Sequence, residues 1–137
     1  MRTLSHAAVL ASLVLGCSVD PCWAQHMNAA EAPCRDVVVT SDVAECFDEA
    51  ARRADKQLNT TYAEIRLALG PQERQDLEGA ERAWLKYRDA ACVAERRLYE
   101  GGTAAIPAYT ACIEEETRQH SSDLRVIYGW RIEKARR

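Results

Sequence analysis

The sequence predicts an all-α protein, an antiparallel bundle of three long helices clipped by two disulfides. Apolar residues recur at intervals of three and four along three long stretches, which is the spacing of one buried helix face. Glycine and proline interrupt these stretches at Gly70-Pro71 and at Gly101-Gly102. No stretch alternates apolar and polar residues as a half-buried β-strand would. Two short connections make neighbouring helices antiparallel.

Residues 1–24 have the features of a signal peptide. Arg2 supplies a positive charge, and the apolar run from Ala7 to Gly16 is too short to span a bilayer as a resident helix. No other apolar stretch approaches membrane length. We therefore expect a periplasmic or secreted protein without a spanning membrane segment.

Two processing sites compete within this signal peptide. Residues 13–17, Leu-Val-Leu-Gly-Cys, resemble a bacterial lipobox, in which Cys17 would be lipidated and would anchor the protein to a membrane. Residues 22–24, Cys-Trp-Ala, resemble an ordinary cleavage site, so that the mature chain would begin at Gln25. Cleavage there leaves four cysteines, whereas lipidation of Cys17 leaves Cys22 as an odd thiol. Cysteine parity favours soluble export, with the lipid anchor as the alternative.

The first helix is expected after an irregular lead-in over residues 25–40. Asp42 and Glu45 have the order of a capping box, with Ser41 as an alternative cap. The apolar stripe that follows contains Val43, Phe47, Ala50, Ala54, Leu58, Tyr62, Ile65 and Leu69. Gly70-Pro71 ends this helix, because proline cannot continue a helix but is tolerated in the first turn of the next.

The second helix is expected from Pro71 to about Tyr99, where Gly101-Gly102 permits a reversal. Its apolar seam contains Leu77, Ala80, Trp84, Tyr87, Ala91, Ala94 and Leu98. We interpret the seam as core, so Trp84 and Tyr87 are packing anchors rather than a ligand-binding aromatic pair.

The third helix should begin near Thr103, with Pro107 in its first turn, and end near Trp130. Its stripe contains Tyr109, Cys112, Ile113, Thr117, His120, Leu124, Ile127 and Tyr128. The helical domain therefore spans residues 41–130. A charged tail over residues 131–137 is expected to fray.

Four cysteines outside the signal peptide predict two disulfides. Cys92 and Cys112 lie ten residues on either side of Gly102, so a helical hairpin that turns there places them at the same height. Cys34 and Cys46 form the other pair, which ties the lead-in to the first turn of the first helix.

The sequence argues against several functional classes. A metal site is not expected, because the cysteines lack CxxC spacing and only His26 and His120 lie outside the signal peptide. Neither an enzyme nor a cofactor is expected, since the chain has no Gly-x-Ser-x-Gly elbow and no phosphate-binding glycine loop. A net charge of -3, from 18 Lys+Arg and 21 Asp+Glu, disfavours a nucleic-acid partner.

A cross-helix polar pair is expected between the first two helices. Counted outward from Gly70-Pro71, Asp55 or Asn59 can approach the level of Arg88 and Asp89. We interpret such a pair as fixing helix register rather than as a functional site.

Two motifs resemble the LprI-type lysozyme-inhibitor domain of bacteria. The first, D-x-x-L-N-x-x-Y, contains Asp55, Leu58, Asn59 and Tyr62, and the second, A-W-x-x-[FY]-R-D-x-x-C, contains Trp84, Tyr87, Arg88, Asp89 and Cys92. The resemblance covers about residues 34–125. It implies a small, helical, disulfide-bonded and exported domain that inhibits lysozyme, in which these motif residues are structural.

The partner implied is a protein, a basic lysozyme, with which the mild acidity of the chain is complementary. The alternative is a cell-envelope interaction or structural module with an unrelated protein partner. Because an active-site cleft is concave, we expect the inhibitory surface at the projecting Glu100-Gly101-Gly102 turn. There Glu100 and Thr103 would present a carboxylate and a hydroxyl.

Overall fold

The computed structural model describes residues 26–137, so the signal peptide, Cys17 and the proposed start at Gln25 lie outside the described residues. A short 3-10 helix, η1 (His26–Asn28), precedes three long helices, α1 (Thr40–Ala68), α2 (Pro71–Arg97) and α3 (Ala105–Ala135). No strand occurs within residues 26–137. The all-α class, the three helices and both predicted disulfides are confirmed.

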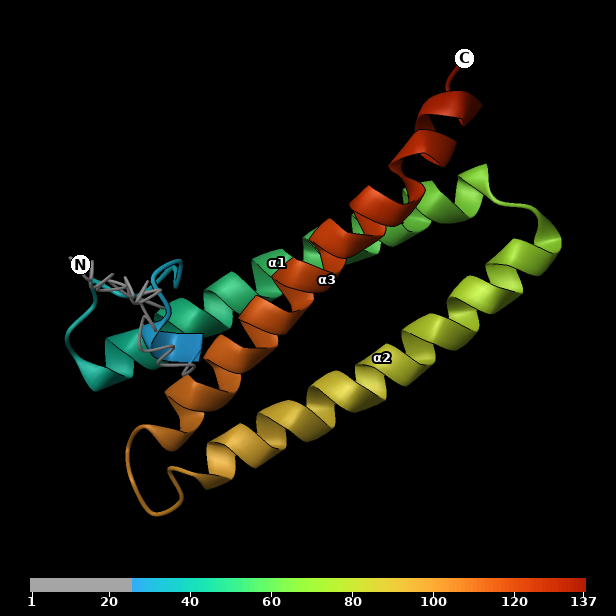
Figure 1. The fold of residues 1–137 in the computed structure, drawn as a ribbon. Coiled ribbons are helices and arrows are strands. Elements are labelled where there is room, and N and C mark those ends of the chain that lie inside the picture. The colour runs from blue at the N-terminus through green and yellow to red at the C-terminus, as the bar shows by residue number, and fades with distance from the viewer. Residues whose placement is uncertain (1–25) are drawn as a thin grey trace, which may run out of the picture.

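Helix α3 is the central helix of the bundle (Figure 1). It shares its largest interface with α1, to which it runs parallel, and a smaller one with the antiparallel α2. The backbones of α1 and α2 come close at few places, although Arg66 pairs with Glu78 at 3.0 Å and Leu77 belongs to the same core cluster as Ile65. Because α3 packs on both neighbours, it buries more residues than either of them: Pro107, Ala108, Ala111, Cys112, Glu114, Thr117, Ser121, Leu124 and Ile132.

The apolar core divides into two clusters. The larger joins all three helices and contains Leu58, Ile65, Leu69, Leu77, Leu124 and Ile132. The smaller lies beneath the lead-in and contains Ala32, Cys34, Phe47 and Ala111. The stripe predicted for the first helix is confirmed, because its members are buried apart from the half-buried Val43 and Tyr62.

Helix α2 has a side-chain capping hydrogen bond at its N-terminus, whereas α1 has none. Helix α1 begins at Thr40, two residues before the predicted start, and its N-cap Val39 makes no side-chain hydrogen bond. The predicted capping box of Asp42 and Glu45 is therefore wrong. At the start of α2 the Glu73 carboxylate accepts a hydrogen bond of 2.8 Å from the Gly70 N–H, which caps that helix.

The prediction that the whole seam of α2 is core is wrong. Leu77 is buried and Trp84 is half-buried, but Tyr87 is 60% exposed and Leu98 is 80% exposed. The physical reason is that α2 lies at the edge of the bundle and packs mainly on α3. A single neighbour can cover only one side of a helix.

Helix α3 continues beyond Trp130 to Ala135, where the sequence predicted a fraying tail. Ile132 is buried in the larger core cluster, and Arg131 pairs with Glu73 at the start of α2. These two contacts hold the last turns against the other helices. Within residues 26–137, no helix has both the length and the apolar composition needed to cross a membrane.

Candidate functional site

The turn between α2 and α3 is an exposed reversal with a defined backbone. The Glu100 N–H donates to the Arg97 carbonyl at 3.2 Å, and the Gly102 N–H donates to the Tyr99 carbonyl at 3.0 Å. Gly101 has a φ of 84°, a left-handed conformation that favours glycine. The four residues predicted as the partner surface, Glu100, Gly101, Gly102 and Thr103, are all exposed.

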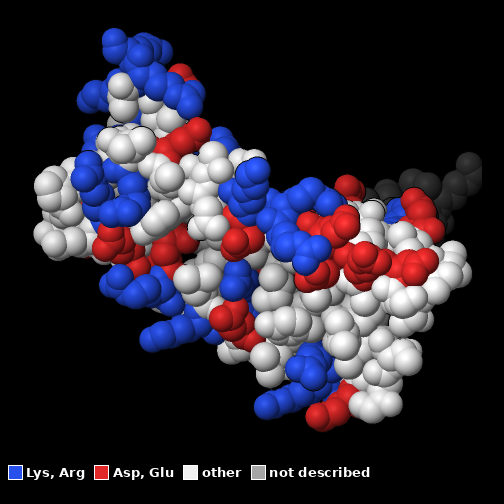
Figure 2. Space-filling model, turned by 180° about the vertical axis from the view of Figure 1, so that it is seen from behind, with Lys and Arg blue, Asp and Glu red and all other residues white. Residues whose placement is uncertain are grey.

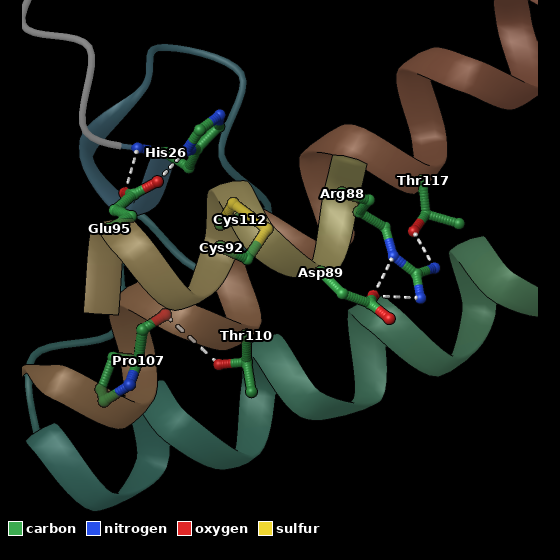
Figure 3. The surroundings of a disulfide bond; sticks show 9 residues. All are labelled: His26, Arg88, Asp89, Cys92, Glu95, Pro107, Thr110, Cys112 and Thr117. Atoms are coloured by element: carbon green, nitrogen blue, oxygen red, sulfur yellow. Dashed lines mark hydrogen bonds and ion pairs between the residues drawn. A yellow bond between two sulfur atoms is a disulfide. The ribbon is translucent and has the colours of Figure 1, made fainter. Parts of the chain in front are cut away.

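Two anchors fix this turn on the bundle. The disulfide between Cys92 and Cys112, whose Cα atoms are 5.4 Å apart, joins the two helices that flank the turn (Figure 3). Tyr99 is half-buried, and its buried hydroxyl makes no hydrogen bond within the described residues. Burial raises the pKa of this phenol. The turn is therefore flanked by a covalent bridge and by a tyrosine whose hydroxyl is buried.

The surface beside the turn combines apolar and charged side chains. Leu98 is 80% exposed and Ile106 is 62% exposed. A shallow pocket of about 310 Å³ is lined by Val93, Arg96, Arg97, Glu100, Gly101 and Ala105. The carboxylate of Glu100 is thus accompanied by two guanidinium groups, so the local charge is mixed rather than acidic.

The lead-in forms the second side of this end of the molecule. The disulfide between Cys34 and Cys46 joins it to α1, with the Cα atoms 6.0 Å apart. A second pocket, of about 230 Å³, lies between the lead-in and the start of α3, and its lining includes Val37, Thr103 and Pro107. The N-terminal lead-in and the start of α3 therefore meet beside the turn.

His26 attaches the N-terminal segment to α2. Its backbone N–H donates to the Glu95 carboxylate at 3.3 Å, and its ring Nδ1 pairs with the same carboxylate (Figure 3). Cys112 lies within reach of these two groups, in an arrangement that could otherwise hold a metal ion. Its sulfur is part of a disulfide, so it is not a thiolate and this trio does not fit a metal.

The residues of the two resemblance motifs fall into a packed set and an exposed set. Leu58 is buried, Tyr62 and Trp84 pack against the larger core cluster, and Arg88 is largely covered. Tyr87, Asp89, Asp55 and Asn59 are exposed. The motifs thus contribute both to the core and to the surface of the bundle.

Arg88 connects α2 to α3 rather than to α1. Its Nη1 donates to the Thr117 hydroxyl at 3.2 Å, and its Nη2 donates to Asp89 at 2.8 Å (Figure 3). Asp55 instead accepts a hydrogen bond of 3.0 Å from Asn59 on its own helix. The predicted pair between Asp55 and Arg88 is therefore wrong, because α2 faces α3 at this level.

The exposed motif residues Asp55 and Asn59 line an open groove of about 440 Å³ between α1 and α2. The complete lining is Asp55, Leu58, Asn59, Tyr62, Glu78, Glu81, Arg82 and Leu85. Burial, and then the negative charge of Glu78, raises the pKa of the Tyr62 phenol. Sequence reasoning missed this groove, since it assumed close packing of the first two helices.

The described residues form a small helical domain whose N-terminal segment and central helix are each secured by a disulfide. The sequence model of the family described as Lysozyme inhibitor LprI matches residues 23–124. That span is well over half of the chain, so the chain belongs to the LprI lysozyme-inhibitor family. The family is one of inhibitors rather than enzymes.

A comparison with curated proteins gives a relative of unknown role. An uncharacterized protein of Rhizobium meliloti (strain 1021) is 30% identical, over 88% of this chain and 94% of the relative. The similarity therefore extends over nearly the whole of both proteins. No solved structure is significantly similar to the chain.

Proposed function

We propose that this protein binds a lysozyme and occludes its substrate cleft with the turn between α2 and α3. The observation that carries the proposal is that Glu100 to Thr103 are exposed while the Cys92–Cys112 bridge joins the two helices that flank the turn. An element that is already ordered loses little conformational entropy when it enters a cleft. Membership of an inhibitor family supports this choice of partner.

The area around the turn is large enough to contribute to a specific interface. A stable complex buries roughly 800 Å² on each partner, which a four-residue turn alone does not provide. Four exposed apolar side chains near the turn enlarge the surface: Leu98, Ile106, Val38 and Val39. The lead-in is part of this surface because it and the start of α3 line one pocket beside the turn. The contact surface proposed here therefore includes the lead-in.

Charge contributes to encounter more than to the contact itself. The chain carries a net charge of -3, which favours approach to a basic protein. At the turn, however, Glu100 lies beside Arg96 and Arg97. Rim charges of this kind set orientation and association rate rather than most of the affinity.

The proposed location is outside the cytoplasm. Two disulfides within residues 26–137 are typical of a protein that folds in an oxidising compartment. We propose cleavage before Gln25 and a periplasmic or secreted protein, with lipidation of Cys17 as the alternative. Mass spectrometry of the N-terminus distinguishes the two, since a diacylglyceryl group would appear on Cys17 only in the second case.

The test is the lysis of a bacterial cell-wall suspension by lysozymes of several types. The variant combines Glu100→Lys with two residues inserted between Gly101 and Gly102. Its matched control is Asp76→Lys, the same charge change at an exposed site near the other end of α2. Circular dichroism verifies that both variants remain helical.

We expect the parent and the Asp76→Lys control to slow lysis equally, and the turn variant to lose roughly tenfold or more of its inhibition. Unchanged inhibition by the turn variant would place the contact surface elsewhere, with the groove beside Asp55 and Tyr62 as the next site to examine. If the parent inhibits none of the lysozymes, the proposal fails and an envelope module with an unrelated protein partner remains.

A further inference from the structure

The last turns of α3 carry a largely exposed face, at whose edge Ile127 and Trp130 line a pocket with residues from the end of α1 and the start of α2. We define the α3 terminal face as Val126, Ile127, Trp130, Lys134 and Arg137. At 100° per residue Val126, Ile127, Trp130 and Lys134 lie within roughly 100° of one another around the helix. Arg137 follows the end of α3 at Ala135. Val126 is 80% exposed, Ile127 is 58% exposed and Trp130 is 63% exposed. Single exposed apolar residues are ordinary, but three neighbouring ones that include a tryptophan mark an interaction surface.

The charge of this end is opposite to that of the whole chain. Residues 125–137 contain five Lys or Arg residues against one acidic residue, Glu133, whereas the chain as a whole has a net charge of -3. Figure 2 shows the basic side chains gathered at the projecting C-terminal end. Exposed apolar side chains that lie next to cations are complementary to a partner with an apolar interior and negatively charged groups at its surface.

Internal pairing neutralises part of this charge but spares the face itself. Arg131 pairs with Glu73 and lies 5.2 Å from the centre of the Trp130 ring, and Arg136 pairs with Glu64 and Glu133. Lys134 and Arg137 make no ion pair within the described residues. The two cations of the α3 terminal face are therefore available to an external partner.

We propose that the α3 terminal face binds an anionic phospholipid surface. Tryptophan is favoured at the boundary between water and acyl chains, and a helix with a basic, aromatic face lies in that boundary. Lysine and arginine beside it gain attraction from anionic headgroups. A second copy of the chain is a poorer occupant, because symmetric pairing would bring the same cations together.

Binding at this face sets the orientation of the domain. The α3 terminal face and the α2–α3 turn lie at opposite ends of α3 (Figure 1). A domain seated on a membrane through Trp130 would therefore direct the Glu100 turn away from the lipid. This inference is independent of the proposed lysozyme contact, because inhibition in a suspension without vesicles does not require the α3 terminal face.

The test is sedimentation of the exported full-length protein with vesicles of phosphatidylglycerol or of phosphatidylcholine. The parent and every variant carry Cys17→Ser, so that no acyl chain on Cys17 contributes. The test variants are Lys134→Glu with Arg137→Glu, and separately Trp130→Ala. The matched control is Lys56→Glu with Lys86→Glu, two exposed lysines on α1 and α2 that make no ion pair within residues 26–137.

We expect the parent to bind phosphatidylglycerol vesicles and not phosphatidylcholine vesicles, and high salt to weaken that binding. The charge-reversal variant should lose roughly tenfold or more in vesicle partitioning, and Trp130→Ala should also weaken it, while the control partitions as the parent does. Equal partitioning of parent and charge-reversal variant would overturn the proposal. No binding by the parent, or equal binding to both lipids, would overturn it as well.

Discussion

The indole ring of Trp84 stacks on the imidazole ring of His120, with the ring centres 3.9 Å apart and the ring planes 9° from parallel. His120 Nε2 lies 2.7 Å from Glu81 Oε1, and the Arg88 guanidinium lies 5.2 Å from the centre of the Trp84 ring. Trp84 and Glu81 of α2 thus contact one histidine of α3, and Arg88 of the same helix lies over the Trp84 ring. Because the backbones of α2 and α1 come close at few places, this cluster and the Cys92–Cys112 bridge carry much of the attachment of α2.

Trp84→Ala should lower the free energy of unfolding by about 2 to 3 kcal/mol, less than for a fully buried tryptophan because Trp84 is half-buried. Tyr87→Ala, one turn further along α2 and 60% exposed, serves as the control and should change stability by less than about 1 kcal/mol. Urea unfolding followed by circular dichroism measures both. Equal losses in the two variants would contradict the role assigned to the stack.

Replacing both Cys92 and Cys112 by serine should lower stability by about 3 kcal/mol, because the bridge closes a loop over a sequence separation of 20 residues. If the turn contacts lysozyme, the double variant should also inhibit more weakly under conditions in which it remains folded. The comparison variant replaces Cys34 and Cys46, whose disulfide spans a sequence separation of 12 residues. Peptide mapping without reduction should recover only these two pairs from the parent, and a Cys46–Cys92 peptide would contradict the fold.

Glu73→Gln should destabilise the protein at neutral pH and have little effect in acid. The Gly70 N–H, and then Arg131, lower the pKa of the Glu73 carboxyl below 4.5, so the folded state favours its charged form. That stabilisation is present above pH 4.5 and is lost as the pH falls through the lower pKa of the folded state. Melting temperatures of parent and variant should converge in this range, and a constant difference would contradict the assignment.

Glu114→Gln should show the opposite pH dependence. Burial raises the pKa of the Glu114 carboxyl above 4.5 despite its pairing with Arg118, so the folded state binds the proton more tightly than the unfolded state. The parent therefore loses stability as the pH rises from 4.5 through the folded-state pKa, and the variant lacks that loss. The melting temperature of the variant relative to the parent should increase from pH 4 to pH 7. A relative decrease over that interval would show that the Arg118 pair outweighs burial.

The helices were predictable because their signals are local. The spacing of Phe47, Leu58 and Ile65 identifies a buried face, and Gly70-Pro71 allows only a short connection. Counting residues outward from a turn also predicts which residues lie opposite each other, provided that the two helices are in contact. Cys92 and Cys112 are equally distant from Gly102, and so are Trp84 and His120, each eighteen residues away. The stack could have been found by the same count.

The same count failed across the Gly70-Pro71 turn, because two helices joined by a short connection need not pack against each other along their length. Asp55 and Arg88 lie on helices joined by Gly70-Pro71, yet α2 turns this side towards α3 and Arg88 bonds to Thr117. The period of apolar residues gives the faces of a helix but not which neighbour covers them. The exposed Tyr87 and the groove beside Asp55 both follow from that arrangement.

The dominance of the interface between α1 and α3 has a consequence for how the chain folds. Residues such as Thr61 and Ser121, whose hydroxyls lie 3.2 Å apart, are 60 positions apart in sequence. When the chain emerges N-terminus first during synthesis or export, the apolar side of α1 stays exposed until nearly all of the following 60 residues have emerged. Helix α2 can cover only a small part of α1 during that interval, through Leu77, so α1 is the segment on which a holding chaperone should act.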